Sequence, residues 1–110
     1  MPRIALRNLT GILFCLVLAL PKHVGAEGDS AQLYKTNCSV CHAADGSGNS
    51  PSGKALKAKD LRSDEVQKKS DTELADGITK GQGKMPPFGK KLKAEQIQQL
   101  VSYVRQLAKK

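Results

Sequence analysis

One five-residue segment, CSVCH at positions 38–42, constrains this chain more than any other feature. If it forms a single helical turn, Cys38, Cys41 and His42 share one face, because residues three and four apart are neighbours on a helix. Two thiols on that face can each add to a vinyl group of a porphyrin, and the imidazole can reach the iron from the same side. The segment therefore predicts a covalently attached haem c, with Cys38 and Cys41 as thioether anchors and His42 as an axial iron ligand.

Two other interpretations of the cysteine pair are weaker. In an oxidising compartment a bare C-x-x-C can close as a disulfide or act as a redox exchanger, but thioredoxin-like motifs need a strand-rich βαβ context that this sequence lacks. A structural zinc site needs four ligands, and Cys38, Cys41 and His42 have no obvious fourth. Haem attachment is the interpretation that uses all three side chains.

The first 26 residues have the layout of a secretory signal peptide. Two arginines precede the apolar run GILFCLVLAL, and small residues at 24–26 offer a cleavage site after Ala26. The run is shorter than the roughly 20 residues that a membrane-spanning helix requires, so a retained anchor is the less favoured alternative. We predict a cleaved signal peptide at 1–26 and an exported domain at 27–110, in a periplasm or a photosynthetic lumen, with no membrane insertion after cleavage.

Removing that segment leaves few side chains for the second axial position of the iron. Of the two histidines and two methionines in the chain, only His42 and Met85 lie in the domain. A second histidine ligand is therefore excluded by count, and Met85 is the remaining candidate. It lies in the stretch GKMPPFG at 83–89, where prolines restrict the backbone and lower the entropy lost on ordering the loop. We predict that His42 and Met85 bind the iron from opposite faces of the porphyrin.

The domain is basic, and the whole chain has a formal net charge of +8. Lysines flank both segments that would border the haem, and a positive rim of this kind steers a protein toward redox partners with acidic docking sites. Few side chains are aromatic (4%), which argues against nucleic acid as a partner. The same scarcity fits a small domain whose core is completed by a flat apolar cofactor. The lysines are Lys54, Lys57 and Lys59, and Lys80, Lys84, Lys90, Lys91 and Lys93.

Caps and apolar residues predict an all-α domain. A first helix starts at Asp29 or Ser30 and leads into the CSVCH turn. A short capped helix begins near Ser63, and a capping box at 70–73 opens a longer helix that ends near Gly81. No segment shows sustained alternation of apolar and polar residues, so no strand is expected.

The strongest helical pattern begins at Ala94. Its apolar residues form an amphipathic face of three turns, and Lys93 is the expected although poor N-cap. We expect this last helix to pack on the first one, in a fold of four or so short helices around the haem. The face comprises Ile97, Leu100, Val101, Val104 and Leu107.

Two segments, 43–53 and 81–89, are predicted loops because they are rich in Gly, Pro, Ser and Asn. The first loop must fold back past the edge of the haem. We therefore expect a backbone carbonyl at 49–51 to accept a hydrogen bond from the second ring nitrogen of His42, which would fix the tautomer and orientation of the ring.

Five motifs occur in this order along the chain: CSVCH at 38–42, DGSG at 45–48, DL at 60–61, KMPPF at 84–88 and LVSYVR at 100–105. In these motifs the chain resembles a monohaem class I cytochrome c, a small bacterial c-type cytochrome. The resemblance covers residues 29–108, and it implies the cytochrome c fold, ligation by His42 and Met85, and transfer of single electrons outside the cytoplasm. The chain departs from many relatives in having no tryptophan to line the pocket.

These observations predict a monomeric electron carrier that is not an enzyme. An iron with both axial positions filled by the protein has no open site for oxygen, peroxide or a substrate. Two alternatives stay open from the sequence. One is a haem enzyme or gas-binding protein in which Met85 dissociates readily, and the other is a fixed electron-entry subunit of a larger oxidase or dehydrogenase.

Overall fold

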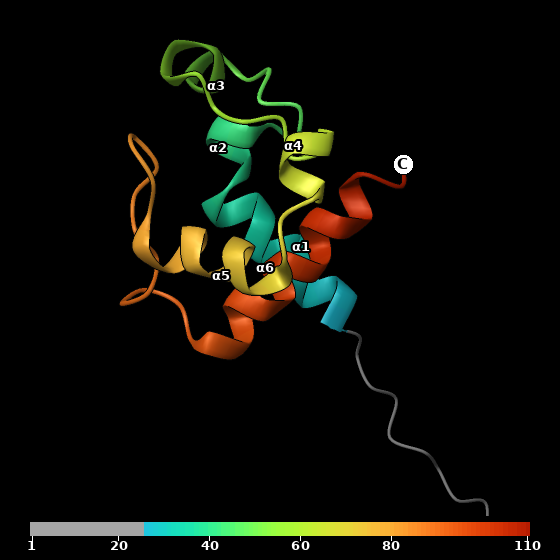
Figure 1. Cartoon of the computed structure of the whole chain (residues 1–110), viewed down its shortest axis with the longest axis vertical. Helices are drawn as coiled ribbons and strands as arrows, with labels where there is room; N and C mark the ends of the chain where they lie inside the picture. The colour runs from blue at the N-terminus through green and yellow to red at the C-terminus, as the bar shows by residue number, and fades with distance from the viewer. Residues whose placement is uncertain (1–25) are drawn as a thin grey trace, which may run out of the picture.

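The structure is a computed structural model that describes residues 26–110 (Figure 1). The predicted signal peptide lies outside the described residues, except that Ala26 begins the first helix. None of the helices in the described range is long and apolar enough to cross a membrane. The helices are α1 (Ala26–Asn37), α2 (Ser39–His42), α3 (Pro51–Leu56), α4 (Asp64–Gln67), α5 (Asp71–Lys80) and α6 (Ala94–Leu107).

The predicted all-α fold is confirmed. Within residues 26–110, strand-like pairing is limited to an isolated bridge between Gln82 and Met85. The helix count exceeds the expected four or so because two of the helices are single turns of four residues, α2 and α4.

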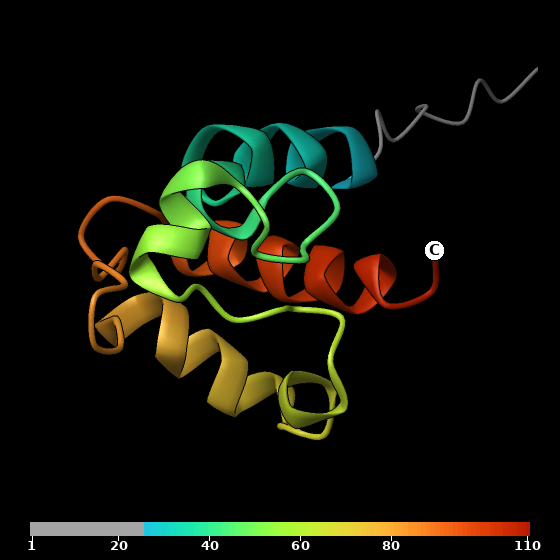
Figure 2. The ribbon, with the colours of Figure 1, turned by 90° about the horizontal axis from the view of Figure 1, so that it is seen from above.

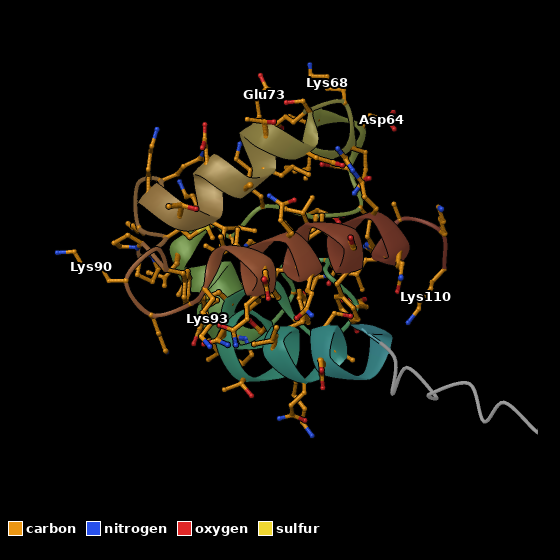
Figure 3. The ribbon with its side chains drawn as sticks, turned by 90° about the horizontal axis from the view of Figure 1, so that it is seen from below. Asp64, Lys68, Glu73, Lys90, Lys93 and Lys110 are labelled. Atoms are coloured by element: carbon orange, nitrogen blue, oxygen red, sulfur yellow. The ribbon has the colours of Figure 1, made fainter. Side chains whose placement is uncertain are left out.

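Helix α6 lies between α1 and α5, as Figures 2 and 3 show from opposite sides. Tyr34 from α1 and Leu100 and Leu107 from α6 form the buried core, each at most 2% exposed. The ring of Tyr34 also contacts that of Tyr103, with centroids 4.8 Å apart and planes tilted by 34°. Burial of side chains of this size contributes about 1.5–3 kcal/mol each. The predicted contact between the first and last helices is therefore confirmed.

The apolar face predicted for the last helix is buried along its whole length. The helix begins after Lys93, as expected, and the side-chain Oε1 of Gln96 accepts a hydrogen bond from the Lys93 backbone N–H (2.8 Å). This bond from the third helical position compensates for the poor cap, because it satisfies a donor at the helix start. The buried residues are Ile97, Leu100, Val101, Val104 and Leu107.

The capped helices in the middle of the chain are also confirmed. Ser63 accepts a hydrogen bond from the backbone N–H of Val66 at the start of α4 (3.3 Å). At the start of α5, Ser70 accepts from the N–H of Glu73 (3.1 Å), and the Glu73 carboxylate accepts from the N–H of Ser70 (2.8 Å). Reciprocal bonds of this kind define a capping box.

The predicted loop at 43–53 is wrong in its last part, because α3 begins at Pro51. Ser50 is the N-cap, and its side chain accepts a hydrogen bond from the Gly53 N–H (2.9 Å). Proline is favoured at the first helical position, where its missing N–H costs nothing. The Ser-Pro pair therefore starts a helix here, although the composition of the segment is typical of a loop.

Arg105 joins α6 to the segment between α4 and α5. Its guanidinium donates hydrogen bonds to the backbone carbonyls of Gln67 (2.9 Å) and Lys69 (2.6 Å) and to the carboxylate of Asp71 (2.9 Å). These bonds fix the connection between α4 and α5, whose side chains form one wall of the site described below.

Candidate haem-binding site

Two adjoining cavities share five lining residues and together form one crevice. The inner cavity, of about 90 Å³, is bounded by α4, α5 and α6, and the outer one, of about 390 Å³, opens between α3 and the 81–89 loop. All four residues predicted to hold the haem line this crevice. Of these four, Cys41 lines the outer cavity alone. The residues that line both cavities are Cys38, His42, Lys59, Gln82 and Met85.

Apolar side chains line most of the inner cavity. They come from α4, α5, α6 and the segment before α4, which lie far apart in the sequence. A flat apolar cofactor would gain the burial that such a surface favours. The apolar residues are Leu61, Val66, Leu74, Ile78, Leu100 and Val104.

The CSVCH segment forms the predicted helical turn. Cys38 is the N-cap of α2, and its carbonyl accepts hydrogen bonds from the N–H groups of Cys41 (3.2 Å) and His42 (2.9 Å). Cys38 and Cys41 are not joined in a disulfide, so both sulfurs are available for attachment to a haem. Burial, with a smaller effect from the neighbouring Cys41, raises the pKa of the Cys38 thiol to about 11. Cys38 therefore keeps its proton at neutral pH.

The orientation of His42 is fixed by a residue that we did not predict. Its Nδ1 lies 2.9 Å from the backbone carbonyl of Lys59. A carbonyl can only accept, so Nδ1 carries the proton and Nε2 is left with the free lone pair. The expected acceptor at 49–51 is wrong, because α3 carries the chain outward before it returns past the imidazole at Lys59.

The 49–51 segment instead binds the end of α2. The hydroxyl of Ser50 lies 2.7 Å from the carbonyl of Val40 and 3.0 Å from that of Cys41. Carbonyls at the last turn of a helix have no partner within it, so Ser50 satisfies groups that α2 leaves open. One side chain thus caps the start of α3 and the end of α2.

Gly53 is the point of closest approach between these two helices. A Cβ atom at this position would overlap the backbone oxygens of Cys41 and Gly48. Glycine allows such an approach because it has no side chain. The haem-anchoring turn is therefore packed directly against the backbone of α3.

The segment that carries Met85 is held mainly at its two ends. Gln82 and Met85 exchange backbone hydrogen bonds (3.1 and 2.8 Å), which place the methionine at a tight turn. At the other end, the N–H of Phe88 donates to the carbonyl of Ile78 (2.9 Å), and the Phe88 side chain is 8% exposed. Inside the turn that Gln82 and Met85 close, Gly83 has no other atom within 4 Å of the place of its absent Cβ.

The donor set of the crevice fits a haem. One imidazole and one thioether lie on different walls, and the two thiols that would attach the porphyrin lie beside the imidazole. Within the described residues, no group of three or more His, Cys, Asp or Glu side chains could hold a bare metal ion.

Charges near the crevice are mostly positive. Few of the lysines take part in the described ion pairs. Among the rim lysines, Lys59 pairs with Glu65 at 2.8 Å. The hydrogen bond from Lys59 lowers the pKa of the Glu65 carboxyl. In the same way, hydrogen bonds from Arg62 lower the pKa of Asp60. Glu65 and Asp60 are thus paired with cations, whereas most of the rim lysines take part in none of the described ion pairs.

Comparison with known proteins agrees with the site. Residues 26–104 match the family described as cytochrome c oxidase, cbb3-type, subunit III. A cytochrome c6 of Gloeothece citriformis is 33% identical over 100 residues, which cover 90% of this chain and 87% of that protein. A cytochrome c6 of Microcystis aeruginosa is 37% identical over 82 residues, which cover 74% of this chain and 98% of that protein.

Two solved structures share the fold. The KustC0563 c-type cytochrome superposes with a TM-score of 0.64 at 35% identity, over 72% of this chain and 96% of that one. Cytochrome c6 from the diatom Phaeodactylum tricornutum superposes with a TM-score of 0.58 at 28% identity, over 77% of this chain and 97% of that one. The chain belongs to the family matched by residues 26–104 and, with these relatives, to the monohaem class I cytochromes c, whose cofactor is one covalently bound haem c.

Proposed function

We propose that this cytochrome carries single electrons between redox partners through a haem that is anchored by Cys38 and Cys41 and held by His42 and Met85. The observation that carries the proposal is that these four side chains line one crevice. The haem, when bound, supplies the one-electron Fe(III)/Fe(II) chemistry. The residues of the chain bind, orient and insulate it.

His42 and Met85 have different roles in this proposal. The hydrogen bond from His42 Nδ1 to the Lys59 carbonyl leaves Nε2 as the nitrogen that can bind a metal. Met85 offers a neutral thioether, which favours the reduced state more than a second histidine would. The apolar inner cavity acts in the same direction, because surroundings without water disfavour the extra positive charge of the oxidised state.

With His42 and Met85 in both axial positions, no position is left for a substrate. We therefore propose an electron carrier and not an enzyme. Exchange of electrons then needs only the approach of a partner to the mouth of the crevice.

A methionine substitution tests the ligand assignment. Met85→Leu keeps the volume of the side chain and removes the sulfur. We expect loss of the weak far-red absorbance band of methionine–iron ligation in the oxidised protein, and a midpoint potential lower by on the order of 0.1 V. Lys84→Gln, one residue away, should keep the band. If Met85→Leu leaves both the band and the potential unchanged, Met85 is not a ligand.

The thioether anchors need a separate test. Replacement of both cysteines, Cys38→Ala and Cys41→Ala, should let acidified acetone extract the haem, whereas the unaltered protein should keep it through denaturation. Either single variant should retain the haem through one bond. Haem that stays attached to the double variant would contradict the assignment.

The mouth of the crevice has the features of a docking surface for a redox partner. Val40 and Leu56 both line the outer cavity and are 62% and 42% exposed, which is high for large apolar side chains. Lys57 and Lys84 line the same cavity. Farther out, Lys90 projects into solvent beside the 81–89 loop (Figure 3). An apolar centre with a positive rim fits a partner whose docking site is acidic.

Salt dependence tests this proposal. We expect the second-order rate of electron transfer to an acidic partner to fall as ionic strength rises, because salt screens exposed charges. Lys84→Gln should weaken that dependence. Lys68→Gln, which makes the same change of charge on the outer face beyond α4 (Figure 3), should leave it nearly unaltered. Rates that do not respond to salt would exclude electrostatic steering.

The proposal also covers where the protein acts in the cell. We propose that the chain is exported through its N-terminal segment, acts as a monomer outside the cytoplasm and is not inserted in a membrane. The description of the matched family, which names an oxidase subunit, favours a second candidate, a fixed electron-entry subunit. Stable co-purification with a membrane complex would support the subunit, and its absence would support the free carrier.

A further inference from the structure

The residue directly after His42 has an unusual backbone. Ala43 ends α2 with φ 65° and ψ 162°. Residues with a Cβ rarely adopt a positive φ, and this combination is close to a region that is used almost only by glycine. Such a conformation persists only where the surrounding structure holds it. The backbone of Ala43 therefore stores strain next to the proposed iron ligand.

Two hydrogen bonds hold the Ala43 carbonyl. The hydroxyl of Tyr34 donates to it at 2.6 Å, and the backbone N–H of Gly46 donates at 3.1 Å. Tyr34 is 2% exposed, and its ring is fixed against Tyr103 and the core of α6. Burial raises the pKa of Tyr34 far above its usual range, so the hydroxyl keeps its proton and acts as a donor.

His42 itself is held by neighbouring segments at two points, its backbone carbonyl and its imidazole ring. Its carbonyl accepts a hydrogen bond from the N–H of Gly48 (2.8 Å), and its Nδ1 binds the carbonyl of Lys59 (2.9 Å). Neither bond involves the Ala43 carbonyl. Among the described side chains, that of Tyr34 donates a hydrogen bond to the Ala43 carbonyl.

We propose that Tyr34 is a positioning residue for His42. Its hydroxyl holds the Ala43 carbonyl in the conformation that stops α2 directly after the histidine, and it thereby fixes the direction of the imidazole. Without the hydroxyl, the Ala43 peptide relaxes toward an unstrained region and turns the residue attached to it. The inference rests on the proposed function, in which His42 is an axial ligand.

Magnetic resonance of the oxidised, haem-loaded protein tests this role. His42 is the histidine within 27–110, so labelling with ¹⁵N-histidine marks its ring, whose iron-shifted signals depend on ring orientation. Tyr34→Phe should shift these signals. Ala43→Gly removes the strain because glycine adopts a positive φ readily. The double variant should therefore return the signals toward those of the unaltered protein.

Tyr103→Phe is the matched control, because it removes a hydroxyl from the neighbouring ring without touching Ala43. Unchanged His42 signals in Tyr34→Phe overturn the proposal even if the melting temperature falls, and so does an equal shift in Tyr103→Phe. If Tyr34→Phe fails to load haem, the double variant must restore loading, and its failure to do so also overturns the proposal. Absence of iron-shifted His42 signals in the unaltered protein contradicts the proposed function instead.

Discussion

The two segments that carry the proposed iron ligands are held in different ways. Around His42, hydrogen bonds from Tyr34, Gly48 and Ser50 reach three successive carbonyls of the chain, those of Ala43, His42 and Cys41. Around Met85, two backbone bonds with Gln82 and the bond from Phe88 to Ile78 fix the chain, and Gly83 inside the Gln82–Met85 turn has open surroundings. The histidine side is a rigid frame, and the methionine side is a loop held at its anchors.

This difference suits the chemistry of the proposed ligands. A frame can present an imidazole before the haem is attached, as the bond from His42 Nδ1 to the Lys59 carbonyl indicates. A thioether is a weak donor, so its bond to iron depends on how firmly the loop holds it. We therefore expect substitutions in the histidine frame to act mainly on stability, and substitutions at the anchors of the methionine loop to act on ligation as well.

The largest effect is expected at an anchor of the methionine loop. Phe88→Ala removes a buried ring and should lower the free energy of unfolding by about 3–5 kcal/mol. The backbone bond from Phe88 to Ile78 remains in this variant, but the buried ring that lines the outer cavity and packs the end of the loop is lost, so the far-red methionine band should weaken or disappear. Denaturant unfolding and the visible spectrum measure the two effects. Phe88→Leu is the control and should keep the band, since it fills part of the space. A full band in Phe88→Ala would mean that the anchor does not hold Met85.

The next largest effect is expected in the histidine frame. Gly53→Ala places a Cβ against the backbone oxygens of Cys41 and Gly48, and neither can move without shifting α2. We expect a loss of about 1–3 kcal/mol in the free energy of unfolding, as for other overpacked sites. The methionine band should persist in the folded fraction. A loss of the band at unchanged stability would contradict the expectation that substitutions in the histidine frame act mainly on stability.

A smaller effect is expected from the shared cap. Ser50→Ala removes the acceptor at the start of α3 and the donor at the end of α2, and should cost about 1–2 kcal/mol. Ser52→Ala changes an exposed residue of the same helix and should stay within about 0.5 kcal/mol of the unaltered protein. Thermal or denaturant unfolding measures the loss of stability in both variants. Equal losses would show that the hydroxyl of Ser50 stabilises neither the start of α3 nor the end of α2.

The smallest effect is expected at the open position of the methionine loop. In Gly83→Ala the new Cβ meets no other atom, so the cost comes from the positive φ of 54° alone. This cost is about 1–2 kcal/mol in the left-handed region, and the lower conformational entropy of the unfolded variant offsets about 0.4–1 kcal/mol of it, so we expect a net loss of about 1 kcal/mol or less in the free energy of unfolding. A loss larger than that of Gly53→Ala would contradict the open surroundings of Gly83.

Much of the fold could be predicted from local signals in the sequence. The capping box at 70–73 and the apolar face of α6 depend on residues within one or two turns, and both are confirmed. His42 and Met85 line one crevice, and their ligation of the iron stays a prediction. α3 was missed because its cap, Ser50, and first residue, Pro51, lie in a stretch whose composition is typical of a loop.

Other features had no local signal. The acceptor for His42 is a backbone carbonyl, which every residue carries, so nothing in the identity of Lys59 could indicate it. The bonds of Arg105 reach residues more than 30 positions away. The role of Tyr34 depends on the positive φ of Ala43, and alanine gives no sign of such a backbone. Contacts of this kind follow from the fold and become visible only with it.

The central claim is that His42 and Met85 close both axial positions of the iron. The most direct measurement is exposure of the reduced, haem-loaded protein to carbon monoxide, with the spectrum of the oxidised protein recorded from the same preparation. The account predicts a far-red methionine band in the oxidised form and little or no carbon monoxide complex in the reduced form. Absence of the band together with rapid carbon monoxide binding would contradict it and favour a gas-binding or catalytic haem.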